Sequence, residues 1–200
     1  MRRFRGEAEN KVDTKGRVSI PAAFRRILEE GDPDWLAGLN PNFVIVYGRR
    51  NSKCLEGYSL KSMDDVDNLV SRLPRYSKDR ETLERLLNAQ SVYAQVDENG
   101  RIVLSPKLRE ISNITDKATF VGMGDKFQIW QPDSYIQDMA LLYKRLSDND
   151  VPCSINLTLE EAITNQQVID NNLVKEKLRI MRDQSKSLDL KKDNVRDKIG

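Results

Sequence analysis

Apolar and polar residues alternate on both sides of a short polar turn, and this pattern occurs twice in the chain. The first copy reads VDTKGRVSIPAAFR over residues 12–25, and the second reads VDENGRIVLSPKLR over residues 96–109. Strict alternation is typical of a half-buried strand, and a tight turn joins the two alternating segments in each copy. The pattern therefore predicts a β-hairpin at each place.

Each predicted hairpin is followed by a helix and by a further pair of strands. A proline, Pro21 or Pro106, stands where the helix would begin. The next apolar segments also correspond between the copies: FVIVYG (43–48) with ATFVGMG (118–124), and CLEGYSLKSM (54–63) with KFQIWQPDSY (126–135). Two more apolar stripes with helical spacing, at 63–73 and 83–87, predict helices that lead into the second hairpin.

These correspondences predict a duplicated unit. The first unit covers residues 1–74, a connecting helix covers 75–90, and the second unit covers 91–146. The remaining residues, 147–200, form a C-terminal extension. From residue 151 onward this extension has no aromatic residue and nine Lys/Arg against eight Asp/Glu. It cannot build a core alone, so we expect either a disordered tail or a helix over 158–182 that packs on a neighbour.

Composition excludes several classes of protein. The 200 residues include no histidine and only two cysteines, too few for a disulfide framework or for a zinc site. No apolar run approaches the length of a membrane span, and the first 30 residues carry charge throughout. We therefore expect a cytoplasmic protein with no metal, no cofactor and no membrane contact.

No catalytic constellation is present in the sequence either. Besides lacking histidine, the chain has no phosphate-cradling glycine loop. The segment VGMGDKF (121–127) lacks the third glycine that a nucleotide fingerprint needs. We predict that the protein is not an enzyme and has no catalytic residues.

The residues of the two turns have different physical roles. Asp13 and Asp97 can accept hydrogen bonds from the backbone ahead of them, and glycine at the fourth position, Gly100 in the second turn, tolerates positive φ. Arginine is not required by a turn. One interpretation is an Asp–Arg bridge that pins the turn, and the other is a fork-shaped cation presented to phosphate or guanine.

Local charge separates the two copies. The net charge of the chain is only +2, but residues 1–26 hold eight Lys/Arg against three Asp/Glu. Arg101 has no other basic residue nearby before Lys107. We therefore predict that the second turn, with Asp97, Gly100 and Arg101, is a structural copy. The predicted DNA-binding residues belong to the first copy: Arg3, Arg5, Lys11, Lys15, Gly16 and Arg17.

The doubled motif, with its flanks FRGEAENKVDTKGRVSIPAAFR, VYAQVDENGRIVLSPKLRE and VGMGDKFQIWQPDSY, resembles the MraZ family over residues 3–146. The resemblance implies an α+β fold: a duplicated, AbrB-like swapped-hairpin β-barrel with peripheral helices. It also implies a ring-shaped homo-oligomer that binds double-stranded DNA and is associated with the nucleoid. Its targets would be repeated G-rich boxes upstream of the division and cell-wall gene cluster, where it would regulate transcription.

A second interpretation belongs to a different class. Antitoxins that share the swapped-hairpin fold bind a partner protein with an extended tail, and the C-terminal extension of this chain could act in the same way. Such antitoxins typically carry one unit and obtain the second by dimerising. This chain carries both copies, which favours the DNA-binding regulator.

Overall fold

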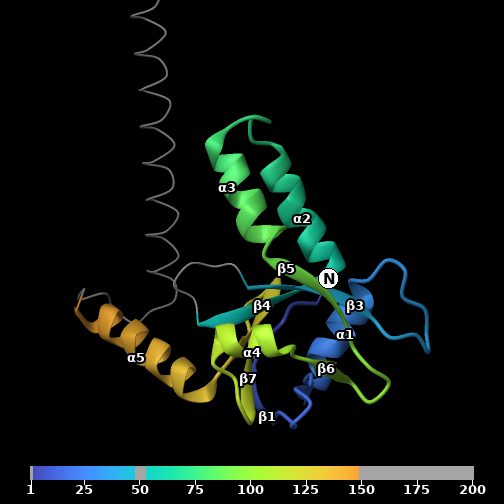
Figure 1. Cartoon of the computed structure of the whole chain (residues 1–200), viewed down its shortest axis with the longest axis vertical. Helices are drawn as coiled ribbons and strands as arrows, with labels where there is room; N and C mark the ends of the chain where they lie inside the picture. Colours follow the sequence, from blue (N-terminus) through green and yellow to red (C-terminus); the bar gives the residue numbers. More distant parts are fainter. Residues whose placement is uncertain (1, 48–52, 149–200) are drawn as a thin grey trace, which may run out of the picture. The chain divides into compact units, whose positions relative to one another are not determined.

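The computed structural model describes residues 2–47 and 53–148, which form an α+β fold (Figure 1). The strands are β1 (Glu7–Lys11), β2 (Arg17–Ser19), β3 (Asn42–Val46), β4 (Cys54–Ser59), β5 (Ser91–Gln95), β6 (Arg101–Val103), β7 (Lys117–Gly122) and β8 (Lys126–Trp130). The helices are α1 (Ala22–Glu30), α2 (Leu60–Ser71), α3 (Lys78–Leu87), α4 (Pro106–Ser112) and α5 (Pro132–Asp148). None of these helices is long and apolar enough to cross a bilayer.

The strands form an open sheet and a separate ribbon. Six strands make one antiparallel sheet in the order β1-β7-β8-β4-β3-β5, and β2 pairs with β6 in a two-stranded ribbon. The prediction of a closed β-barrel is therefore wrong for the described residues. The sheet stays open because of the two turns. At each turn the chain leaves an edge strand, β1 or β5, and enters a ribbon strand, β2 or β6, and these two ribbon strands pair with each other.

Neither predicted hairpin closes on itself beyond its turn. β1 pairs with β7 of the second copy, with Ala8 opposite Phe120, and β5 pairs with β3 of the first copy, with Tyr93 opposite Val44. Between the arms of the first turn only an isolated bridge remains, from Val12 to Val18. Strands of both copies thus share one sheet, and the boundaries given above for the copies stay a prediction. Residues Met1–Ala140 form one compact unit.

The central strands β3, β4 and β8 are covered on both faces of the sheet. β3 contains the unbroken run FVIV, which is typical of a strand that is covered on both sides. Phe43 and Ile45 belong to the main core, whereas Val44 and Val46 pack with Met63 of α2 in a second cluster. The main core also receives side chains from the ribbon segments and from the helices that follow them: Val18, Ile20, Phe24, Ile27, Leu28, Ile102, Leu104 and Leu108.

Phe127 of β8 lies at the centre of the aromatic cluster in the main core. It is fully buried, and its ring centroid lies 5.0 Å from that of Phe4, 5.5 Å from Phe24, 5.9 Å from Phe43 and 6.1 Å from Phe120. Its cross-strand partner is Gly57, where any Cβ would overlap the ring. The absence of a side chain at Gly57 is what makes room for Phe127.

The helices α2 and α3 begin where serine side chains cap them. Ser59 Oγ accepts from the backbone N–H of Ser62 at 3.2 Å, and Ser77 Oγ accepts from that of Arg80 at 3.2 Å. The predicted helices are confirmed, but their apolar stripes are only partly covered. Leu69 is 60% exposed, and α3 buries none of its residues completely. The helix predicted over 158–182 lies outside the described residues.

Candidate nucleic-acid interface

The first turn is held by the carboxylate of Asp13. One oxygen, Oδ1, accepts from the backbone N–H groups of Lys15 and Arg17, both at 2.9 Å. The other, Oδ2, lies 2.6 Å from Arg17 Nε. The carboxylate therefore fixes both the backbone of the turn and the direction in which the Arg17 side chain leaves it.

The second turn repeats this arrangement. Asp97 Oδ1 accepts from the backbone N–H groups of Asn99 at 2.9 Å and of Arg101 at 2.8 Å. Asp97 Oδ2 lies 3.0 Å from Nε and 2.9 Å from Nη2 of Arg101. The bridge predicted from the sequence is thus present in both turns. It leaves open what else the arginines contact, since the Arg17 and Arg101 side chains are 38% and 32% exposed.

Glycine is required in both turns by the backbone. Gly16 has φ +79° and Gly100 has φ +72°, in the left-handed region that side chains disfavour. Each glycine also fastens its turn to the other copy. Gly16 O accepts from Leu104 N at 2.8 Å, and Gly100 O accepts from Ile20 N at 2.9 Å.

Two arginines that the sequence reasoning gave no role lie under the turns. Arg25 of α1 packs against Gly100, and Arg109 of α4 packs against Gly16. Within the described residues, the Nε atom of each is buried and has no hydrogen-bond partner. These arginines occupy the same position in the two copies, and that equivalence was the signal available in the sequence. They support the turns from the opposite copy.

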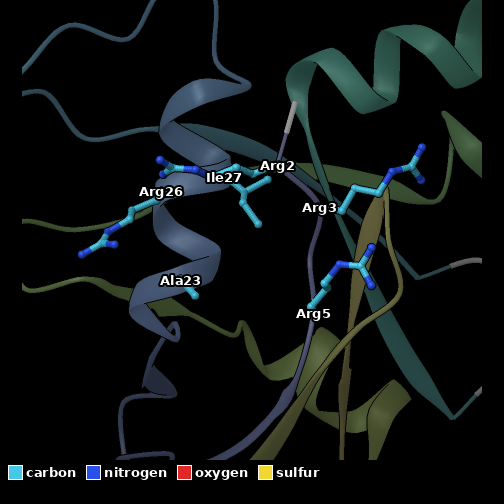
Figure 2. A pocket seen from close by; sticks show the side chains of 6 residues that line it. All are labelled: Arg2, Arg3, Arg5, Ala23, Arg26 and Ile27. Atoms are coloured by element: carbon cyan, nitrogen blue, oxygen red, sulfur yellow. The ribbon is translucent and has the colours of Figure 1, made fainter.

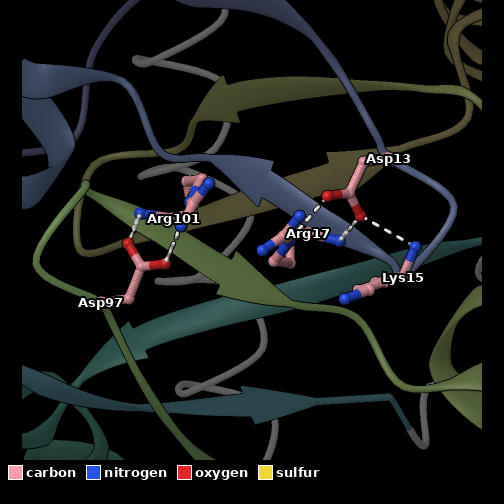
Figure 3. A network of polar contacts seen from close by, with 5 residues as sticks. All are labelled: Asp13, Lys15, Arg17, Asp97 and Arg101. Atoms are coloured by element: carbon pink, nitrogen blue, oxygen red, sulfur yellow. Dashed lines mark hydrogen bonds and ion pairs between the residues drawn. The ribbon is translucent and has the colours of Figure 1, made fainter.

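Both motif arginines lie on one face of the ribbon. The register pairs Arg17 with Val103, Val18 with Ile102 and Ser19 with Arg101. Val18 and Ile102 point into the core, and successive side chains alternate, so Arg17 and Arg101 project from the outer face. Figure 3 shows the two guanidinium groups side by side on the ribbon, each beside its own aspartate.

The predicted DNA-binding residues fall into two groups. Lys15, Gly16 and Arg17 belong to the turn, and Lys11 ends β1 just before it, with both lysines exposed. Arg3 and Arg5 precede β1 and lie near its other end. A five-residue strand spans on the order of 13 Å. The structure thus separates Arg3 and Arg5 from the turn with which the sequence grouped them.

The turns differ in charge although they share a geometry. Thr14 and Lys15 occupy the middle of the first turn, and Glu98 and Asn99 occupy the same places in the second. Lys15 and Glu98 are both exposed. A phosphate that approaches the ribbon therefore meets an extra cation on the Arg17 side and an extra anion on the Arg101 side.

Replacing Gly16 by alanine should destabilise the fold. A left-handed φ costs a residue with a side chain about 1–2 kcal/mol, and the new Cβ would also collide with the backbone oxygen of Leu104. Gly6→Ala is the matched control, because Gly6 has φ +91° and open space around it. Urea unfolding should show a larger loss for Gly16→Ala than for Gly6→Ala. Equal losses of stability would mean that the ribbon backbone shifts to accommodate the new Cβ without a loss of free energy.

Acid should weaken both turns. The backbone N–H of Arg17, aided by its side chain, lowers the pKa of Asp13 below the usual 3.8, and Arg101 lowers the pKa of Asp97 in the same way. A depressed pKa in the folded state stabilises the fold above pH 3.8, and this contribution is lost as the pH falls through the folded-state pKa. Asp13→Asn combined with Asp97→Asn should therefore flatten the dependence of the urea midpoint on pH below about 4. An unchanged slope would contradict the role of these two carboxylates.

The described residues contain no group of three or more His, Cys, Asp or Glu that could hold a metal ion. What the turns and the ribbon offer instead is a set of charge-assisted donors aimed outward. Such donors recognise anionic oxygens and the acceptor edge of guanine.

Comparison with known proteins gives a match over most of the described chain. The family described as "MraZ protein, putative antitoxin-like" matches twice, over residues 3–86 and 87–148. A protein of Ruegeria pomeroyi is 53% identical over 137 residues, which cover 68% of this chain and 82% of that protein. A protein of Cereibacter sphaeroides is 44% identical over 144 residues, covering 68% and 84%. A protein of Parvibaculum lavamentivorans is 36% identical over 146 residues, covering 73% and 86%. All three carry the name "Transcriptional regulator MraZ".

Proposed function

We propose that this chain, which belongs to the MraZ family, is a DNA-binding regulator of transcription that contacts DNA with the outer face of the β2–β6 ribbon. The names of its relatives support the regulatory role. The observation that carries the DNA contact is the outward guanidinium of Arg17, which Asp13 holds in place between the exposed Lys11 and Lys15.

The ribbon has a two-stranded form and a chemistry that suit the major groove of DNA. That groove admits a two-stranded ribbon, and arginine binds O6 and N7 of guanine with two hydrogen bonds. In this proposal Arg17 contacts a base or a phosphate, while Lys11 and Lys15 contact phosphates. Gly16 is buried against Leu104 and allows the tight turn that presents Arg17, and Asp13, Asp97 and Gly100 hold the turns. Arg101, beside Glu98, contributes more to the turn than to the contact.

The proposed assembly is a ring-shaped homo-oligomer whose subunits bind repeated G-rich boxes in the DNA. The family resemblance supports both features, and in this proposal the boxes lie upstream of the division and cell-wall gene cluster. Within the described sheet, β1 and β5 each have an edge without a neighbouring strand, and Tyr93 on β5 is 82% exposed. Edges of this kind are usually covered by a partner. A protein bound to chromosomal DNA in this way would be associated with the nucleoid.

Light scattering tests assembly and binding together. The purified chain should have a mass that is a multiple of 23.0 kDa, and a short duplex with G-rich repeats should raise the mass of the complex. A duplex of the same composition in scrambled order is the control. A monomeric mass at micromolar concentration would contradict the ring, and equal binding of both duplexes would contradict sequence-specific recognition.

A further inference from the structure

A basic hollow of about 650 Å³ lies between the segment that precedes β1 and the helix α1. None of the residues that line it is acidic, and four of the six are arginines. The lining consists of Arg2, Arg3, Arg5, Ala23, Arg26 and Ile27 (Figure 2). The turn residues of the ribbon are not among them, so this hollow is separate from the proposed DNA contact.

Most of the positive charge around the hollow is uncompensated. Arg2 Nη1 lies 3.0 Å from Glu30 Oε1, which partly neutralises that guanidinium. Arg3, Arg5 and Arg26 are exposed, and none of them forms an ion pair with another residue that the structure describes. Like charges that line one hollow repel one another, and a bound anion would relieve this repulsion.

The directions of the side chains indicate the shape of the anion. Figure 2 shows Arg3 and Arg5 pointing the same way from the N-terminal segment, while Arg2 reaches across α1 and Arg26 points away from them. Guanidinium groups that fan out in this way suit several phosphates along a chain better than one compact ion. Arginine forks match phosphate oxygens with paired hydrogen bonds.

The rest of the lining limits what can be recognised. Ala23 and Ile27 are apolar, and no amide or hydroxyl side chain lines the hollow to read a base or a sugar. Asp65 and Asp125 line a smaller adjoining hollow of about 230 Å³ that shares Arg2 and Arg3. Because these carboxylates repel anions, the phosphates should lie on the side of Arg5, away from the adjoining hollow.

We propose that this hollow binds a chain of phosphate groups, supplied either by a free polyphosphate or by the backbone of a DNA strand. The site recognises phosphate groups and does not distinguish one base from another. It goes beyond the ribbon contact and uses none of the ribbon's residues.

Calorimetry with sodium tripolyphosphate at constant ionic strength tests the site in the full-length protein. We expect one tripolyphosphate per chain, and at least tenfold weaker binding by the folded double variant Arg3→Ala/Arg5→Ala. The matched control is Arg72→Ala/Arg75→Ala, which removes two exposed arginines at the α2–α3 connection and changes the net charge equally. The control should bind within about twofold of the unchanged protein. Absence of binding, or the same loss in the control, would overturn the proposal.

Competition with a duplex identifies the source of the phosphates. If tripolyphosphate and duplex bind together and Arg3→Ala/Arg5→Ala keeps its affinity for DNA, the site takes a free polyphosphate. If the duplex displaces tripolyphosphate and the variant loses more DNA affinity than the control, the site takes the DNA backbone. Both results support a phosphate site. Arg17→Ala should leave tripolyphosphate binding unchanged, so failure of the ribbon proposal and failure of this one are distinguishable.

Discussion

Arg17→Ala is expected to abolish most of the affinity for a G-rich repeat duplex while the protein stays folded. A good bidentate contact with a base contributes about 1–3 kcal/mol, and copies arranged around a ring would lose it at every box at once. The turn should survive, because Asp13 keeps two backbone donors, the N–H groups of residues 15 and 17, when the guanidinium is removed. Fluorescence anisotropy with a labelled duplex measures the loss, and circular dichroism checks the fold.

Arg101→Ala is the internal control for this result. Its guanidinium is likewise paired with an aspartate and has nearly the same exposure as that of Arg17, but Asn99 stands in the place of Lys15 and Glu98 in the place of Thr14. We expect Arg101→Ala to lower stability more than affinity. Because both arginines lie on one ribbon face, equal losses of DNA binding would show that the two turns share the duplex, and the argument from local charge would then be wrong.

Lys15→Ala separates phosphate contacts from base contacts. It should weaken binding to G-rich and scrambled duplexes alike, and reduce the salt dependence by about one counterion. A selective loss on the G-rich duplex would instead assign Lys15 to a base.

Phe127→Ala should have the largest effect on stability. Removal of a buried phenylalanine typically costs about 3–5 kcal/mol, and here the ring contacts four other phenylalanines that cannot all close the gap. The free energy of unfolding from urea titration at constant chain concentration measures the loss. Tyr76→Ala is the control, since that side chain is 95% exposed and its removal should change stability by less than about 0.5 kcal/mol. A loss below about 1 kcal/mol for Phe127→Ala would mean that the core repacks around the gap.

Local chemistry in the sequence was enough to predict the turns and the helices. The bonds of Asp13 and Asp97 span four residues or fewer, so the motif indicated the bridges as one of two interpretations and favoured positive φ at the two glycines. Pro21 and Pro106 also predicted where α1 and α4 begin, because a proline favours the first position of a helix. The outward direction of Arg17 and Arg101 followed from alternation along a strand.

The pairing of the strands was decided only by the tertiary structure. Alternation specifies which face of a strand is buried, but the backbone N–H and C=O groups of β1 would pair equally well with any strand. The hairpin prediction therefore failed where β1 joins β7 and β5 joins β3. The same exchange brought Arg109 under Gly16 and Arg25 under Gly100; the repeat showed that the two arginines are equivalent, but not that each packs against the turn of the other copy. The pairing of β2 with β6 also set Arg17 and Arg101 on one face. The course of β1 placed Arg3 and Arg5 away from the turn. The sequence could not predict this separation, because a count of charges along the chain does not say where the side chains lie in space.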